Sequence, residues 1–167
     1  MVKYMLMIAA DLESITDLQP QGGCDDSSFQ FLFKVKCGNC GEVSQKETCV
    51  ILDETVSVPG SRATANLVQK CKFCGRDGTV LMVPGNGNPL TLETSEQGNY
   101  APLMMFDCRG YEPEGFVFGG GEWKAVSTAG TKYEGIDLSD GEFSEYDEKG
   151  ECPVMISNLT SKFEVVK

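Results

Sequence analysis

The 167-residue sequence predicts an all-β protein, with a β-sandwich or barrel-like architecture. Apolar residues alternate with other residues from Tyr4 to Leu12 and again from Phe29 to Val35, which is the period of two of a half-buried strand. Turn sequences rich in Gly and Pro, such as PQGG, VPGNGNP and FGGGE, lie between the expected strands. No ten-residue stretch shows a convincing helical period of 3.6, so several short strands joined by turns are expected.

Further strands are expected where β-branched and aromatic residues gather between turns. They cover 47–52, 63–70, 79–83, 103–108, 115–118, 122–126 and 154–166, the last with an interruption near Asn158. One domain over residues 1–167 is expected, because this length supports one well-buried core. The similar strands FLFKVKCGN and LMMFDCRGY, each ending in a cysteine followed closely by glycine, suggest an internal duplication into two pseudo-symmetric halves.

Charge limits the classes of partner. The chain has 14 basic and 25 acidic residues, a formal charge of −11, and such a surface repels DNA and RNA. No signal peptide and no apolar run of about 20 residues is found, so a cytoplasmic protein, also nuclear by diffusion, with no membrane contact is expected. Thiols in that compartment are normally reduced, and the eight cysteines are therefore expected to be ligands or buried groups.

Two similar stretches, KCGNCG and KCKFCG, contain Cys37, Cys40, Cys71 and Cys74. Two Cys-x-x-Cys knuckles supply the four thiolates of a tetrahedral zinc site, and the glycine after each knuckle permits a tight turn. Thirty residues lie between Cys40 and Cys71, so the intervening segment must fold into strands of its own. We expect one structural Zn(II) that clamps two hairpin tips together.

Alternatives to structural zinc are a thiol redox couple, unliganded buried thiols, and Cu(I) or another soft ion on the same sulfurs. A thioredoxin-type redox knuckle is expected at a strand-to-helix turn, and neither knuckle precedes a helical pattern. A closed four-sulfur site leaves no position for a reactive water. The chain contains no histidine, so the usual catalytic arrangements with histidine cannot form.

The other cysteines have separate interpretations. Cys108 is expected to be a buried thiol at a strand end, with a nucleophile whose pKa is lowered by Arg109 as the alternative. Cys24 is expected to be exposed in a polar loop, whereas Cys49 and Cys152 are expected to pack in strands.

Two other features are weighed for function. The acidic segment 141–148 is interpreted as a solvated loop, with a cation site or a patch for a basic partner as the alternative. Trp123 is expected to pack in the core, with a recognition role as the alternative.

The ordered blocks ADLESITDLQP, LFKVKCGNCGE, ANLVQKCKFCGRDG, MMFDCRGYEPEGF and FSEYDEKG resemble the eukaryotic CXXC motif containing zinc binding proteins, from about Tyr4 to Phe163. The resemblance implies an all-β protein with one zinc at Cys37, Cys40, Cys71 and Cys74, and it supplies no catalytic activity. The extra cysteines Cys24, Cys49 and Cys152 are not carried over as ligands, and the insertion GGCDDSS lengthens the first loop.

Three functions remain open from the sequence. We favour a monomeric, non-catalytic protein-interaction module that presents the knuckle loops around Asn39 or Phe73 to a protein partner. The second is a zinc or copper trafficking protein with a labile site. The third is a thiol oxidoreductase of the methionine sulfoxide reductase type, with Cys108 as nucleophile and Cys24 or Cys49 as resolving thiol.

Overall fold

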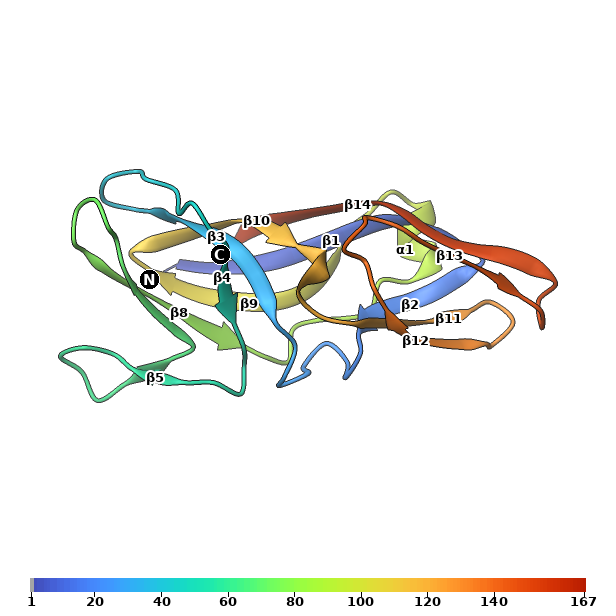
Figure 1. The fold of residues 1–167 in the computed structure, drawn as a ribbon, viewed down its shortest axis with the longest axis horizontal. Helices are drawn as coiled ribbons and strands as arrows, with labels where there is room; N and C mark the ends of the chain where they lie inside the picture. The colour runs from blue at the N-terminus through green and yellow to red at the C-terminus, as the bar shows by residue number, and fades with distance from the viewer. Residues whose placement is uncertain (1) are drawn as a thin grey trace.

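The computed structural model describes residues 2–167, and they form strands joined by short turns (Figure 1). A six-stranded antiparallel sheet in the order β13-β14-β1-β9-β8-β7 runs along the molecule, and a three-stranded sheet, β10-β3-β4, packs on its inner face near one end. A second three-stranded sheet, β12-β11-β2, lies towards the other end, and β5 pairs with β6.

The elements follow in chain order. They are β1 Val2–Glu13, β2 Ile15–Pro20, β3 Phe31–Cys37, β4 Thr48–Val50, β5 Val56–Ser57, β6 Thr64–Ala65, β7 Leu67–Lys70, β8 Asp77–Val83, α1 Leu92–Glu96, β9 Ala101–Arg109, β10 Tyr111–Val117, the 3-10 turn η1 Phe118–Gly120, β11 Trp123–Ser127, β12 Lys132–Ile136, β13 Phe143–Asp147 and β14 Cys152–Val166.

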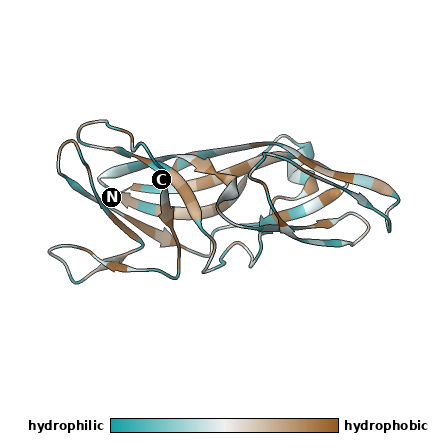
Figure 2. Ribbon diagram, in the orientation of Figure 1, coloured by the Kyte–Doolittle hydropathy of each residue, from teal (hydrophilic) through white to brown (hydrophobic). Residues whose placement is uncertain are grey.

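The core lies between the six-stranded sheet and β3. Alternate residues of β1, including Leu6 and Ile8, are buried, and hydrophobic residues concentrate along the central strands (Figure 2). The ring of Phe33 lies edge-on to Phe106 of β9 and Phe163 of β14, with centroids 5.1 and 5.4 Å apart. Burial of such rings is the main favourable contribution to packing the two sheets together.

The predicted all-β fold is confirmed, and most expected strands form within a few residues of their expected bounds. The expected interruption of the last strand is wrong, because β14 runs unbroken over Cys152–Val166. A bulge lies there instead: Asn158 has φ of 53°, and the β1–β14 register shifts between Ala9 and Asp11. Trp123 is fully buried, as expected, and its indole N–H donates a hydrogen bond to the carbonyl oxygen of Phe118.

Strands β2, β5, β12 and β13 and the single helical turn α1 were not predicted from the sequence. Thr91 caps α1 by accepting a hydrogen bond from the backbone N–H of Thr94. The capping threonine is a recognisable start signal, but five residues are too few to display a helical period. No helix within residues 2–167 is long and apolar enough to cross a membrane.

The interpretation of 141–148 as a solvated loop is wrong in part. Phe143–Asp147 is strand β13, paired with β14, and Asp147 at its end is buried. Hydrogen bonds from the side chains of Ser127 and Thr131 hold the pKa of Asp147 below its usual value. The carboxylate therefore fixes the turn between β11 and β12 against β13.

The suggested duplication stays a prediction. Strand β3 is central in the three-stranded sheet, whereas β9, its proposed counterpart, lies between β1 and β8 in the larger sheet. Both strands end close to the same place, because Cys37 is paired with Tyr111 just after β9.

Asn66 links the segment before β7 to the rest of the fold. Its side-chain oxygen accepts a hydrogen bond from the backbone N–H of Met82 at 2.7 Å, and its side-chain nitrogen lies 2.9 Å from the carbonyl oxygen of Glu54. Asn66 also donates to the carbonyl oxygens of Ile51 and Leu52. One buried amide thus holds the long connection between the two knuckles on β8.

We predict that Asn66→Ala lowers the free energy of unfolding by about 2 to 3 kcal/mol, because the buried N–H of Met82 and several carbonyls lose their partner. Thermal and urea unfolding measure this change. The matched control is Asn99→Ala, since the side-chain amide of Asn99 is exposed and donates to the exposed side chain of Gln97. Equal stability of the two variants would contradict the role given to Asn66.

Candidate metal centre

The two knuckles occupy corresponding turns on two sheets. The first follows β3 directly, and the second joins β7 to β8. In the first, the backbone N–H of Cys37 donates to the carbonyl oxygen of Glu42 and that of Gly41 to the oxygen of Cys37, at 2.8 and 2.9 Å. The second knuckle repeats this pattern, so the two loops share one backbone conformation.

In the second knuckle the N–H of Cys71 donates to the carbonyl oxygen of Arg76 and that of Gly75 to the oxygen of Cys71, at the same distances. Gly41 and Gly75 have φ of 80° and 77°, in the left-handed region that favours glycine. The expectation that each glycine permits a tight turn is confirmed, and these turns direct both sulfurs of a knuckle to one side.

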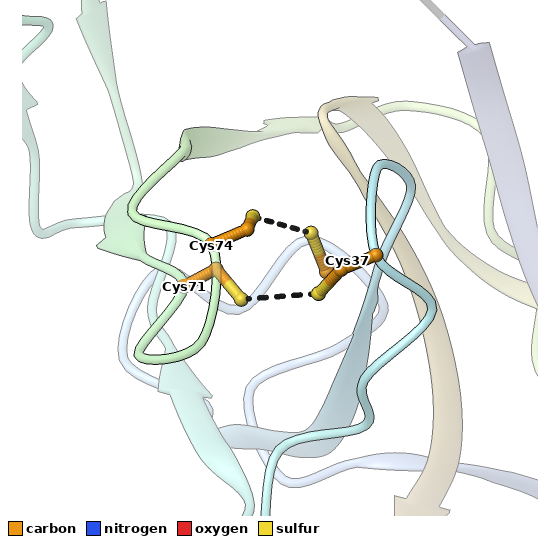
Figure 3. A group of neighbouring side chains, drawn as sticks. Cys37, Cys71 and Cys74 are labelled. Carbon is orange, nitrogen blue, oxygen red and sulfur yellow. Dashed lines mark hydrogen bonds between the residues drawn. The ribbon is translucent and has the colours of Figure 1, made fainter.

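The four sulfurs of Cys37, Cys40, Cys71 and Cys74 lie within 4.8 Å of one another. The sulfurs of Cys37 and Cys74 are 3.6 Å apart, and so are those of Cys40 and Cys71, with the two hairpin tips facing each other (Figure 3). A disulfide needs about 2.05 Å. Sulfurs around tetrahedral Zn(II), at about 2.3 Å from the ion, are about 3.8 Å apart. The arrangement therefore fits a metal with four thiolate ligands.

The electrostatic environment of the four sulfurs also favours a bound cation. The backbone N–H groups of Cys40 and Asn39 hydrogen-bond the sulfur of Cys37 and lower its pKa. The backbone N–H of Glu42 also hydrogen-bonds the sulfur of Cys40 and lowers its pKa. Burial and the neighbouring thiols have the larger combined effect and raise the pKa of Cys40 to about 12. Four adjacent thiolates repel one another, so they are all ionised only when a positive ion lies among them.

Asn39 and Arg76 connect the knuckles beside the sulfurs. The Arg76 guanidinium donates to the side-chain oxygen of Asn39 at 3.3 Å. The backbone N–H of Arg76 and the side chain of Asn39 hydrogen-bond the sulfur of Cys74 and lower its pKa to about 6. Such outer contacts orient a ligand and stabilise its ionised form. Sequence reasoning did not find this role of Asn39 and Arg76.

The turn between β9 and β10 supports both knuckles from behind. The backbone N–H of Gly38 donates to the carbonyl oxygen of Gly110, and the hydroxyl of Tyr111 donates to the oxygen of Gln69 at 3.0 Å. The Tyr111 ring packs so closely on Gly78 that a Cβ there would lie 2.1 Å from it. Tyr111 was not a candidate from the sequence, although it belongs to one of the blocks that carry the family resemblance.

The remaining cysteines lie outside the cluster. Cys108 is buried as expected, and burial together with Asp107 raises its pKa to about 12, opposite to the alternative in which Arg109 lowers it. Cys24 is half-buried, not exposed as expected, because its Cβ packs near Gly87. Cys49 is exposed, not packed, because it points outward between two buried neighbours on β4. Cys152 is half-buried.

The fold and the cluster define an all-β protein with a four-cysteine metal centre. A protein-family sequence model, described as “CXXC motif containing zinc binding protein, eukaryotic”, matches residues 5–164 of this chain. A UPF0587 protein of Caenorhabditis elegans is 39% identical over 97% of this chain and 94% of its own length. The human CXXC motif containing zinc binding protein is 36% identical over 98% of both chains.

Solved structures agree with this relationship. The crystal structure of C1orf123 matches with a TM-score of 0.85 and 35% identity, covering 98% of this chain and 99% of the other. A hypothetical protein from Plasmodium falciparum, 22% identical, has the same fold with a TM-score of 0.81 over 98% and 100% of the two chains. The chain belongs to the eukaryotic CXXC motif containing zinc binding protein family.

We predict that Cys108 does not react with a small alkylating agent in the folded, zinc-loaded protein, because its thiol is buried and protonated near neutral pH. Exposed Cys49 is the internal reference, and mass spectrometry after proteolysis measures both. Labelling of Cys108 as fast as that of Cys49 would contradict this prediction and support Cys108 as a nucleophile.

Proposed function

We propose that this protein binds one Zn(II) per chain through Cys37, Cys40, Cys71 and Cys74, and that the ion is structural. The observation that carries the proposal is the convergence of four sulfurs from the tips of two sheets. Zinc is preferred to Cu(I) because four thiolates in a tetrahedral arrangement satisfy Zn(II) fully. A closed site of this kind supports a non-catalytic role.

The expected energetic effect of the ion is large. Structural zinc in small domains contributes an apparent 10 to 16 kcal/mol or so at neutral pH, comparable with the roughly 5 to 15 kcal/mol that stabilises a whole domain. In this chain the ion would connect the turn after β3 to the turn before β8, which lie in different sheets. Loss of the ion is therefore expected to separate these two edges.

We predict that Cys37→Ser and Cys71→Ser each lower the zinc content and reduce the melting temperature by about 10 °C or more, because a loss of several kcal/mol shifts Tm by that amount in a chain of this size. Elemental analysis and calorimetry give the two quantities. Cys49→Ser is the matched control, since Cys49 lies on the surface outside the cluster. Full zinc content and unchanged Tm in both ligand variants would refute the structural zinc.

We propose further that the zinc clamp presents the knuckle loops to a protein partner. Phe73, between the two cysteines of the second knuckle, is 66% exposed, the largest value among the exposed large hydrophobic residues. Exposed aromatic side chains are frequent anchors of protein interfaces, and a rigid turn lowers the entropy cost of using one. The charge of −11 supports a protein rather than a nucleic acid as partner.

We predict that Phe73→Ser loses the partner proteins that zinc-loaded wild-type chain retains in affinity purification from its own cells, while its zinc content is unchanged. Tyr146→Ser is the matched control, since Tyr146 is 58% exposed on β13 near the other end. Quantitative mass spectrometry compares the three samples. The same retained proteins in all three would contradict the role of the second knuckle.

A further inference from the structure

The four-cysteine centre contains two kinds of sulfur ligand. Cys40 and Cys74 are exposed, whereas Cys37 and Cys71 are buried, so each knuckle contributes one residue of each kind. Oxidation of a cysteine requires that the oxidant reach a sulfur in its thiolate form, and cysteines bound to Zn(II) are thiolates. Cys40 and Cys74 are therefore the two ligands that a small dissolved oxidant can reach.

Each exposed sulfur faces a buried sulfur of the other knuckle. The sulfurs of Cys74 and Cys37 are 3.6 Å apart, and so are those of Cys40 and Cys71 (Figure 3). An approach of about 1.5 Å brings either pair to the length of a disulfide bond. The buried member of each pair is thus placed to react with its exposed partner once that partner has been oxidised.

The competing pairs of cysteines lie within a single knuckle. There the backbone N–H of Gly41 donates to the carbonyl oxygen of Cys37, and that of Gly75 donates to the oxygen of Cys71, both at 2.9 Å. Two sulfurs that one turn directs to the same side must lean towards each other to form a bond, and this movement distorts the turn. A bond across the gap brings the two tips together and leaves both turns intact. The geometry therefore favours disulfides between the knuckles.

We propose that Cys40 and Cys74 are oxidation sites, and that a hydroperoxide converts the metal centre into the disulfides Cys37–Cys74 and Cys40–Cys71 with release of the ion. The oxidant class is hydrogen peroxide or an organic hydroperoxide. This proposal rests on the proposed zinc centre and concerns the regulation of that same site.

Each disulfide consumes one molecule of hydrogen peroxide. The Cys74 thiolate attacks one peroxide oxygen, the O–O bond breaks, and a sulfenic acid and a hydroxide ion form. The Cys37 thiolate then attacks the sulfur of Cys74, so that an S–S bond forms, the S–O bond breaks and a second hydroxide leaves. Two electrons pass from the two thiolates to the peroxide, and protons from solvent convert the hydroxide ions to water. Cys40 and Cys71 react in the same way, and the loss of the four thiolates releases Zn(II).

Oxidation changes the knuckle loops without separating the two sheets. Both disulfides join the turn after β3 to the turn between β7 and β8, across sequence separations of 37 and 31 positions. Disulfides that close loops of such length stabilise a fold. The tips move closer together, and this movement displaces Asn39 and exposed Phe73, which lie between the ligands of each knuckle. Peroxide therefore alters the surface proposed to bind a partner while the clamp persists in covalent form.

The test treats the zinc-loaded full chain with hydrogen peroxide, alkylates the remaining thiols and digests the protein with trypsin. Trypsin cleaves between Cys71 and Cys74 and leaves the first knuckle whole as peptide 37–46. The expected product is this peptide linked to both peptides of the second knuckle, and its fragmentation in the mass spectrometer is expected to assign Cys37 to Cys74. A zinc-binding dye is expected to record one zinc released per chain, in step with the linked product.

The matched control is Cys49→Ser, which removes an exposed cysteine outside the cluster. This variant is expected to give the same linked product and the same zinc release as wild type. Three results would each overturn the proposal. They are a link between the two peptides of the second knuckle, disulfides between chains, and a centre that keeps its zinc at a peroxide concentration that oxidises Cys49 in wild type.

The same samples distinguish this inference from the proposed zinc centre. One zinc per chain before peroxide, followed by any of those three results, excludes the oxidation sites and leaves the structural zinc in place. A reduced, folded chain that holds no zinc before peroxide is added contradicts the structural zinc and, with it, the release of the ion by oxidation.

Discussion

Repulsion among four closely spaced thiolates is the constraint on which the zinc-binding end of this fold depends. The sulfurs lie within 4.8 Å of one another, and each knuckle supplies one buried and one exposed cysteine. The Arg76 backbone N–H and the Asn39 side chain lower the pKa of Cys74, whereas burial and the neighbouring thiols raise that of Cys40. With a divalent ion, the attraction of each thiolate to the metal would outweigh this repulsion, and the ion would join the ends of two sheets.

The rest of the structure is arranged around this junction. Aromatic packing between β3 and the six-stranded sheet holds the sheets together farther along, through Phe33, Phe106 and Phe163. Tyr111 and Gly110 fill the space behind the knuckles. The knuckles thus pack on these residues on one side and face solvent on the other, which is a suitable arrangement for recognition.

The sequence was sufficient for the all-β fold and for the grouping of Cys37, Cys40, Cys71 and Cys74, because period-two alternation and Cys-x-x-Cys spacing are local signals. It was insufficient for β13, whose acidic residues mask a strand, and for the burial of Cys24 and Cys49, which depends on neighbours distant in sequence. The roles of Tyr111, Asn39 and Arg76 were also not predictable, because they arise only when the two knuckles face each other.

X-ray absorption at the zinc edge, combined with native mass spectrometry of the same sample, tests whether the two knuckles share one zinc ion. The structure predicts one zinc per chain, surrounded by four sulfur atoms at about 2.3 Å. Nitrogen or oxygen atoms in the first coordination shell, or a chain that folds with no bound metal, would contradict the clamp formed by the two knuckles.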